Sequence, residues 1–305
     1  MRLLAPAKLN LHLRVGPPRA DGFHPLLSWM VTIGFFDTLI IEPSPQPGIR
    51  LECDWPEVPC DARNLVSKAA AALAEALIAA GQGSAKQYGL SVRLHKQIPV
   101  GAGLAGGSSD GARILAGLNV LWNAGWDRQR LADFAARFGS DLSFFFFAPS
   151  AICTGRGEIV RPIASPQAKF ALLILPEITM PTPLVYRRFD GMKLGDAATI
   201  ETEPDFNGWA RLDALSLLPR LVNDLEAPAF AIDPRLGDLR RNVEQTVGRR
   251  ILMSGSGSSL FTLFDEEPQA AAAEHIVVQR HRVRAIVARL APLLQDDLNT
   301  SGAIR

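Results

Sequence analysis

The sequence predicts an α+β protein of two domains. Its 305 residues are enough for roughly two domains of ordinary size. Segments that alternate between polar and apolar residues, as half-buried strands do, are interspersed with alanine- and leucine-rich segments of helical period. Turn-rich residues 149–162 separate two such sets of segments, so we place the domains at residues 1–160 and 161–305.

The composition excludes several classes of protein. Hydrophobic residues make up 48% and charged residues 21% of the chain, as in soluble globular proteins. The net charge of +1 gives no overall field that would favour nucleic acid or an anionic membrane. Three widely spaced cysteines form no metal-binding pattern and suit a reducing compartment. With no apolar leader and no membrane-length run, we expect a cytoplasmic protein without a metal ligand, nucleic acid partner or membrane.

Residues 7–15 alternate as a strand whose polar face carries Lys8 and Asn10. On these residues alone, an ordinary solvated strand face explains the pattern equally well. Residues 21–25 form a turn. The segments expected next are two strands joined at Phe36 and Asp37, a helix, an alternating strand, and two helices, the second capped by Asp127; they span residues 26–33, 38–41, 63–80, 90–98, 108–122 and 127–138.

Asp141 interrupts the helical pattern and directly precedes the apolar residues 144–147, which we expect to form a buried strand. An acid next to such a segment is a candidate for function. The alternative is a helix-capping aspartate, because Asp and Ser both favour such positions.

The second half predicts a strand, several helices and a hairpin around a glycine- and serine-rich loop. Thr182 can cap a helix and Pro183 can begin one. The segments expected are a strand at 170–175, helices at 181–189, 206–218, 225–233 and 235–247, strands at 251–253 and 260–264, and a helix from 268. Residues 275–294 carry arginines on one side; a solvated face explains them better than a membrane or partner helix. Residues after 295 are expected to fray.

The most informative segment is residues 99–109, which contain Gly101, Gly103, Gly106 and Gly107 between a strand-like and a helix-like segment. Successive unhindered N–H groups and a following helix N-terminus bind phosphate well. Residues 101–106 satisfy G-x-G-x-x-G, but the preceding strand alternates, Pro99 intervenes, and no acidic residue ends a second strand about 20 positions on, where a ribose would be held. A Walker A loop is also excluded, because no Gly-Lys-Ser/Thr follows.

Together, these segments resemble the GHMP small-molecule kinases. Residues 5–11, 99–109, 139–141 and 223–226 with 253–259 resemble the signatures of that family in its order, over residues 3–264. Residues 19–24 and 181–186 are similar to the corresponding segments in the branch of that family that phosphorylates a cytidine diphosphate-linked polyol. The resemblance implies a two-domain GHMP kinase fold with mixed sheets and helices, and an active site in the cleft between the domains.

The resemblance also implies the roles of individual residues. Asp141 would accept the proton of the substrate hydroxyl, a role worth about 10² to 10⁴ in rate, and Lys8 would keep it ionised. ATP, accompanied by Mg²⁺, would be bound by Asn64, Leu65, Lys96, Pro99, Val100, Gly101, Ala102, Gly103, Leu104, Ala105, Gly106, Gly107, Ser108 and Ser109. The substrate would be bound by Asn10, Phe23, His24, Asp141, Thr182 and Tyr186, with the cytosine between the two aromatic rings.

Three positions depart from the family pattern: Ser143 replaces a proline, Phe23 a tyrosine and Gly111 an alanine. Two other functions stay open. The chain could be a GHMP kinase for another alcohol, of mevalonate or homoserine type, since the glycine loop is shared. It could also be a catalytically silent ATP-binding protein, although the presence of both Lys8 and Asp141 argues against this. The expected partners are a small-molecule substrate and ATP, and the expected state is a monomer or weak homodimer.

Overall fold

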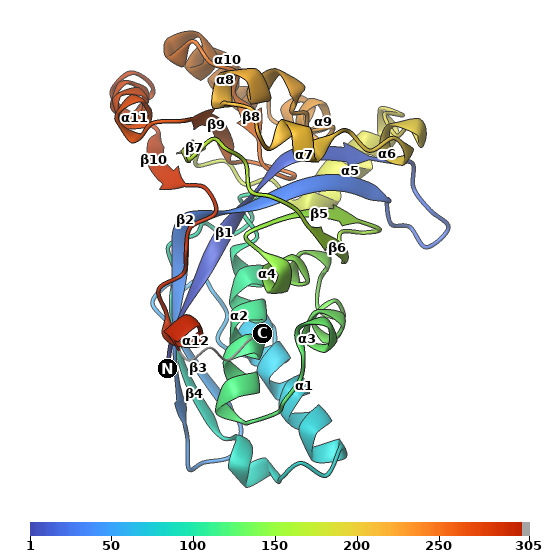
Figure 1. Cartoon of the computed structure of the whole chain (residues 1–305), viewed down its shortest axis with the longest axis vertical. Coiled ribbons are helices and arrows are strands. Elements are labelled where there is room, and N and C mark those ends of the chain that lie inside the picture. Colours follow the sequence, from blue (N-terminus) through green and yellow to red (C-terminus); the bar gives the residue numbers. More distant parts are fainter. Residues whose placement is uncertain (301–305) are drawn as a thin grey trace.

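Two β-sheets with their helices form the two halves of an elongated molecule (Figure 1). The computed structural model describes residues 1–300, so residues 301–305 of the predicted second domain lie outside the described part of the chain. One sheet contains both parallel and antiparallel pairs, and helices flank both sheets. The predicted α+β class with mixed sheets is therefore confirmed.

The larger sheet has six strands in the order β3-β4-β2-β5-β6, with β1 along the other edge of β2. Only β3 and β4 pair in parallel. The strands are β1 (Arg2–Val15), β2 (Leu26–Pro43), β3 (Ile49–Cys53), β4 (Leu90–His95), β5 (Ser150–Thr154) and β6 (Ile159–Pro162).

Strand β2 is continuous, so the prediction of two strands joined at Phe36 and Asp37 is wrong. Strand β1 pairs across this point, with Ala5 opposite Asp37 and Pro6 opposite Phe36, and a register shift after Pro6 absorbs the irregularity. Asp37 is fully buried and its charge is neutralised by Lys96. A long antiparallel partner strand and a buried cation thus keep the chain extended where a junction between two strands was predicted.

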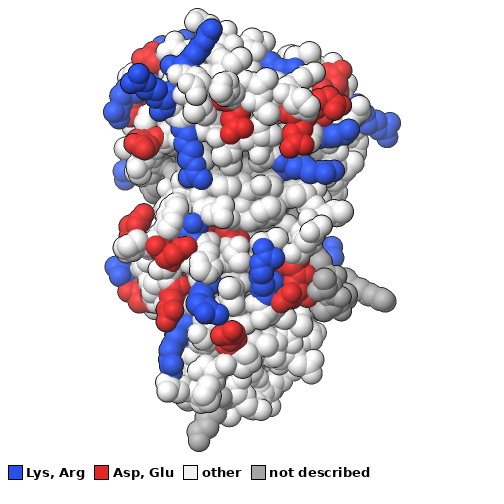
Figure 2. All heavy atoms as spheres, turned by 90° about the vertical axis from the view of Figure 1, so that its left-hand side faces the viewer, with Lys and Arg blue, Asp and Glu red and all other residues white. Residues whose placement is uncertain are grey.

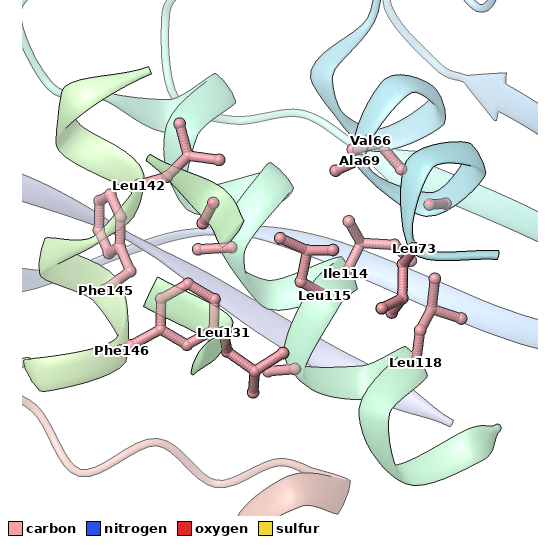
Figure 3. Close-up of a cluster of buried hydrophobic side chains, with 14 of the residues drawn as sticks. Val66, Ala69, Leu73, Ile114, Leu115, Leu118, Leu131, Leu142, Phe145 and Phe146 are labelled. Carbon is pink, nitrogen blue, oxygen red and sulfur yellow. The ribbon is translucent and has the colours of Figure 1, made fainter. Parts of the chain in front are cut away.

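Helix α2 (Gly106–Leu121) lies at the centre of the helical layer on the larger sheet. Figure 3 shows Ile114, Leu115 and Leu118 of α2 between side chains of α1 (Leu65–Ala79) and those of the segments after α3. The remaining elements of this layer are η1 (Ala85–Tyr88), α3 (Arg128–Ala135), η2 (Ser140–Leu142) and α4 (Phe144–Phe147). Asp127 caps α3 by accepting a hydrogen bond from Arg130 N, as predicted.

Residues 144–147 form one turn of helix, α4, and not the strand that we expected. Phe144, Phe145 and Phe146 are nevertheless buried, as expected of so apolar a segment. A short apolar run does not by itself distinguish a buried helix from a buried strand. The helical turn follows from Phe146 N donating to the carbonyl oxygen of Ser143, whose hydroxyl in turn donates to the carbonyl oxygen of Ala132.

The smaller sheet is antiparallel and has the order β10-β7-β9-β8. Its strands are β7 (Phe170–Leu175), β8 (Leu252–Met253), β9 (Leu260–Phe264) and β10 (Arg284–Arg289). The hairpin predicted around residues 254–259, the second glycine-containing loop, is confirmed as β8 and β9. The helices of this half are α5 (Thr182–Gly191), α6 (Ala198–Glu201), α7 (Phe206–Trp209), α8 (Ala214–Leu217), η3 (Leu218–Arg220), α9 (Glu226–Ile232), α10 (Pro234–Val247) and α11 (Glu267–His281).

Several expectations for the second half need correction. Residues 206–218 form short helices and not one, and Thr182 is the first residue of α5 without capping it. The basic segment 275–294 is not one helix. Helix α11 ends before Arg282, which has a positive φ of 50°, and the chain then forms β10, which is held by pairing with β7. Residues 296–298 do not fray. Leu298, in α12 (Asp297–Thr300), is 2% exposed and packs into the core under the larger sheet.

The two halves are joined by the long strands β1 and β2, which run from the larger sheet into the other half (Figure 1). Leu13 bridges to Asn223, and Arg14 Nη1 lies 2.9 Å from Asp224 Oδ1. The division at 160/161 stays a prediction; β6 ends at Pro162 and β7 begins at Phe170. Over residues 1–300, none of the helices has the length and apolar character needed to span a membrane. Figure 2 shows side chains of both charges intermingled on one face.

Candidate active site

A cleft of about 920 Å³ is lined by residues of both halves. Most of the residues selected from the sequence line it. They are Lys8, Asn10, Phe23, His24, Asn64, Leu65, Lys96, Pro99, Val100, Gly101, Ala102, Gly103, Ala105, Gly106, Gly107, Ser108, Asp141, Thr182 and Tyr186. Leu104 and Ser109 do not, because their side chains are buried in the protein.

The glycine loop, residues 99–105, occupies one end of the cleft, which we call the loop end. Gly103 has a φ of +77°, and a Cβ atom there would lie 2.1 Å from the carbonyl oxygen of Ser254. Glycine is therefore required by conformation and by space. Helix α2 begins at Gly106, two positions before the predicted Ser108, and its first turn carries no acidic residue. Its N-terminus is thus suited to an anion in the cleft.

Lys8 and Asp141 meet beside this loop. Lys8 Nζ lies 3.7 Å from Asp141 Oδ2 and donates hydrogen bonds to Asn10 Oδ1 and, at 2.9 Å, to the carbonyl oxygen of Gly103. Lys8 is 3% exposed, whereas one third of the Asp141 side chain is exposed. Burial lowers the pKa of Lys8, and the charge of Asp141 opposes this shift. A carboxylate open to the cleft therefore lies between a buried cation and a phosphate-binding loop.

Asn10 and the second glycine-containing loop complete the floor of the cleft. Asn10 Nδ2 donates to Ser28 Oγ at 2.8 Å, and Asn10 N donates to Ser254 Oγ. Ser254 Oγ donates to the carbonyl oxygen of Gly103 at 3.0 Å, so the two loops are directly linked. Thr182 Oγ1 lies 2.8 Å from Ser256 Oγ, which places α5 against the same loop.

The opposite end of the cleft, which we call the aromatic end, is lined by Phe23, His24 and Tyr186. Phe23 is 50% exposed, and the ring of Tyr186 lies 5.1 Å from that of His24. His24 Nδ1 lies 2.9 Å from the carbonyl oxygen of Gly16, and His24 Nε2 lies 3.3 Å from Asp190 Oδ1. Burial, with the nearby charge of Asp141, raises the pKa of Tyr186 to about 12, so its hydroxyl is neutral.

Sequence reasoning missed several residues at or behind the cleft, among them Arg156, Asp190 and Asp37. Arg156 lines it and places its guanidinium carbon 4.6 Å from the centre of the Phe23 ring. Asp190 also lines it; it follows Tyr186 by four residues on α5, a spacing that puts both on one helix face. Asp37, behind the loop end, was missed because it lies at the predicted junction of two strands. Arg156 lies in an ordinary-looking turn, and nothing in the local sequence distinguishes it.

Lys96 lies at the loop end in a buried group of charges. Its ammonium contacts Asp37 Oδ2 and, at 2.9 Å, Asp110 Oδ2. Burial lowers the pKa of Lys96, but the two carboxylates outweigh this effect and raise it overall. Burial raises the pKa of Asp110 to about 7; Lys96 opposes and Asp37 adds to this shift. Lys96 is therefore a fixed cation at the wall of the cleft.

Two of the three departures from the family pattern, Ser143 and Gly111, lie near the segment that carries Asp141. Ser143 is buried, and its hydroxyl donates to the carbonyl oxygen of Ala132 at 3.1 Å. A Cβ atom on Gly111 would lie 3.1 Å from Leu142 Cδ2, so the missing methyl group lets α2 approach the segment that carries Asp141. Both residues thus contribute to the packing that positions this carboxylate.

Comparison with known proteins identifies relatives over most of the chain. The GHMP kinases N terminal domain model matches residues 64–148, and the GHMP kinases C terminal model matches residues 200–282. A 4-diphosphocytidyl-2-C-methyl-D-erythritol kinase of Shouchella clausii (strain KSM-K16) is 36% identical over 267 residues, which cover 86% of this chain and 85% of that protein. One from Nocardioides sp. (strain ATCC BAA-499 / JS614) is 38% identical over 260 residues, covering 83% and 84%.

Solved structures agree with these relatives. A crystal structure of 4-(cytidine 5'-diphospho)-2C-methyl-D-erythritol kinase superposes with a TM-score of 0.76 and 34% identity, covering 96% of this chain and all of that one. A homoserine kinase from Cytophaga hutchinsonii has a TM-score of 0.68 and 16% identity over 96% of this chain and 94% of that one. The latter shows a shared fold only.

Proposed function

Because this chain belongs to the 4-diphosphocytidyl-2-C-methyl-D-erythritol kinases of the GHMP kinase family, we propose that it phosphorylates the 2-hydroxyl of that substrate with ATP. This reaction is a step of non-mevalonate isoprenoid precursor biosynthesis. The observation that carries the chemistry is the contact of Lys8 with Asp141, 3.7 Å apart beside the glycine loop.

In the proposed mechanism, ATP lies at the loop end with its phosphates on the glycine loop and the N-terminus of α2. Phosphoryl transfer depends mainly on positioning and on stabilising developing negative charge. Unhindered N–H groups of the loop and the ammonium of Lys8 would supply that charge stabilisation. Asn64 and Leu65, at the start of α1, and Lys96 would border the adenosine.

Asp141 would accept the proton of the substrate hydroxyl as it attacks the terminal phosphorus. Its carboxylate lines the cleft, is one third exposed and lies 3.7 Å from the buried ammonium of Lys8, so it is open to a bound substrate as a general base must be. Asn10 and Thr182 would hold the polyol, because both line the cleft on either side of the second loop.

The cytosine would lie between Phe23 and Tyr186 at the aromatic end. Aromatic faces contribute about 0.5–1.5 kcal/mol per stacked pair beyond the area that they bury. His24 would contact the edge of the base. Its ring nitrogens face Gly16 and Asp190, which hold the side chain in place.

Mg²⁺ would accompany ATP. Among residues 1–300, no group of three or more His, Cys, Asp or Glu residues could hold a metal alone, but Mg²⁺ is usually held by phosphates with one or two protein ligands. Asp110 lines the cleft, and its Oδ1 is buried without a hydrogen-bond partner near the start of α2, so it fits this need; Ser109 Oγ also has no partner but lies behind the cleft surface. When bound, Mg²⁺ would neutralise phosphate charge.

We further propose a cytoplasmic enzyme, monomeric or a weak homodimer, that acts on small molecules and binds neither nucleic acid nor membranes.

An ADP-release assay tests the function. The purified chain is offered ATP with 4-diphosphocytidyl-2-C-methyl-D-erythritol, mevalonate or homoserine. We expect rapid ADP release with the first and none above background with the others. A preference for a substrate without cytidine would refute the proposed specificity, and ATP binding without turnover on any substrate would favour a silent ATP-binding protein.

A further inference from the structure

Asp37 lies where strand β4 leaves the sheet. Strand β2 pairs with β4 from Thr38 to Pro43, and the last pair joins Thr38 to His95. Beyond this point the carboxylate of Asp37 replaces the strand as hydrogen-bond acceptor. Asp37 Oδ1 accepts from Gln97 N at 2.6 Å and from Ile98 N at 2.9 Å. The side chain thus determines the path of the backbone immediately before Pro99 and the glycine loop.

The second oxygen of Asp37 binds Lys96, and through it reaches the helix that follows the glycine loop. Lys96 Nζ contacts Asp37 Oδ2 and lies 2.9 Å from Asp110 Oδ2 on α2. All three side chains are at most 6% exposed. One buried network therefore connects the residues that enter the glycine loop to the helix that leaves it.

Packing leaves little room for this network to shift. A Cβ atom on Gly106, the first residue of α2, would lie 3.2 Å from Asp37 Oδ2 and 3.0 Å from the Cβ atom of Ile98. Helix α2, the entry segment and the Asp37 carboxylate are thus in close contact at one point. A buried carboxylate with ionic and backbone partners holds such contacts more firmly than neutral hydrogen bonds would.

From this geometry we propose that Asp37 is a positioning residue of the nucleotide site. It does not line the cleft. It acts by holding Lys96 at the cleft wall and by setting where the glycine loop begins. This inference rests on the proposed ATP site at the loop end, but not on the identity of the alcohol that is phosphorylated.

The test measures ATP affinity separately from turnover. Asp37→Ala removes every contact, and Asp37→Asn keeps the shape and one acceptor oxygen, so the second variant serves if the first does not fold. The matched control is Asp296→Asn, which weakens the buried contact of Asp296 with Arg113 away from the glycine loop. The dissociation constant of ATP without alcohol, the Michaelis constants of both substrates and the melting temperature are measured for each protein.

We expect Asp37→Asn to weaken ATP binding about tenfold, since hydrogen bonds to charged groups are the stronger class, with the Michaelis constant of the alcohol unchanged at saturating ATP. Asp296→Asn should lower the melting temperature but leave ATP affinity within twofold. Wild-type ATP affinity in a folded Asp37→Asn protein would overturn the proposal, as would equal weakening in the control. If the wild type binds ATP but does not phosphorylate the cytidine substrate, the proposed function fails while this inference stands.

Discussion

At the loop end of the cleft, glycine and alanine residues make up much of the wall, whereas the aromatic end is lined by large side chains. Glycine and alanine residues between positions 101 and 107 line the cleft there, with Lys96 also in the wall and Asp37 behind it. Phe23, His24 and Tyr186 come from a turn and from α5, and they are held by other side chains. A glycine-rich wall suits a phosphate chain, and aromatic side chains suit a flat base.

This difference predicts that substitutions at the two ends weaken the binding of different substrates. Changes to the loop end should act through backbone conformation and weaken ATP binding. Changes to the aromatic end should remove single contacts and weaken binding of the alcohol substrate. Asp141 lies between them and should affect the chemical step alone.

The largest effect is expected for Asp141→Asn. The amide cannot accept the substrate proton, so the turnover number should fall by about 10² to 10⁴, with both Michaelis constants within a few-fold of the wild type. ADP release with the cytidine substrate measures this. Asp133→Asn, at an exposed position on α3, is the control and should be fully active. Full activity of Asp141→Asn would remove this residue from the role of base.

The second-largest effect is expected for Gly103→Ala at the loop end. The new Cβ atom would lie 2.1 Å from the carbonyl oxygen of Ser254, and φ is +77°, so the two loops must separate. We expect at least tenfold weaker ATP binding and a lower melting temperature. Gly101→Ala is the matched control, because its φ is +68° but no atom lies within 4 Å. Gly101→Ala should cost only the strain of an alanine in the left-handed region, roughly 1 to 2 kcal/mol of stability. Equal effects would mean that contact between the loops is unimportant.

His12 predicts a pH effect on stability. Strand β1, which carries Lys8 and Asn10, buries this ring against Phe206 and Trp209. Burial, aided by the charge of Arg14, lowers the pKa of His12 from 6.5 to about 4. The neutral ring therefore contributes stability fully above pH 6.5, and this contribution is lost as the pH falls toward 4.

At pH 5 the loss should be about 2 kcal/mol, measured as the free energy of unfolding in urea at pH 7.5 and pH 5. His12→Phe should reduce this pH dependence by that amount. His275→Gln, at an exposed position on α11, is the control for replacing a histidine. An unaltered pH dependence in His12→Phe would show that other groups cause the acid destabilisation.

The smallest effect is expected for Phe23→Leu at the aromatic end. Loss of one stacking face, about 0.5–1.5 kcal/mol, should raise the Michaelis constant of the cytidine substrate about two- to tenfold. The Michaelis constant of ATP and the melting temperature should not change, because Phe23 is half exposed. Leu215→Ala, at an exposed position outside the cleft, should match the wild type. An effect on ATP affinity would contradict the independence of the two ends.

Local features of the site could be predicted because their physical causes are local. Gly101 and Gly103 have the positive φ angles that made a glycine loop attractive, and Asp127 caps its helix through a residue three positions away. The alternating pattern of residues 7–15 correctly placed Lys8 and Asn10 on a strand, and both side chains face the cleft.

By itself, the sequence determined the α+β class and the glycine loop, since each depends on local patterns, and its resemblance to the GHMP kinases selected Lys8 and Asp141 as candidate residues. The tertiary structure decided that β2 continues through Asp37, that Lys96 lies between two carboxylates, and that Arg156 covers Phe23. Each of these contacts joins residues that are distant in the chain, such as Asp37 and Ile98, 61 positions apart. Because Asp37 is buried, water cannot solvate its carboxylate, so the charge requires a partner within the protein. That partner is distant in the chain, and no local sequence pattern predicts it.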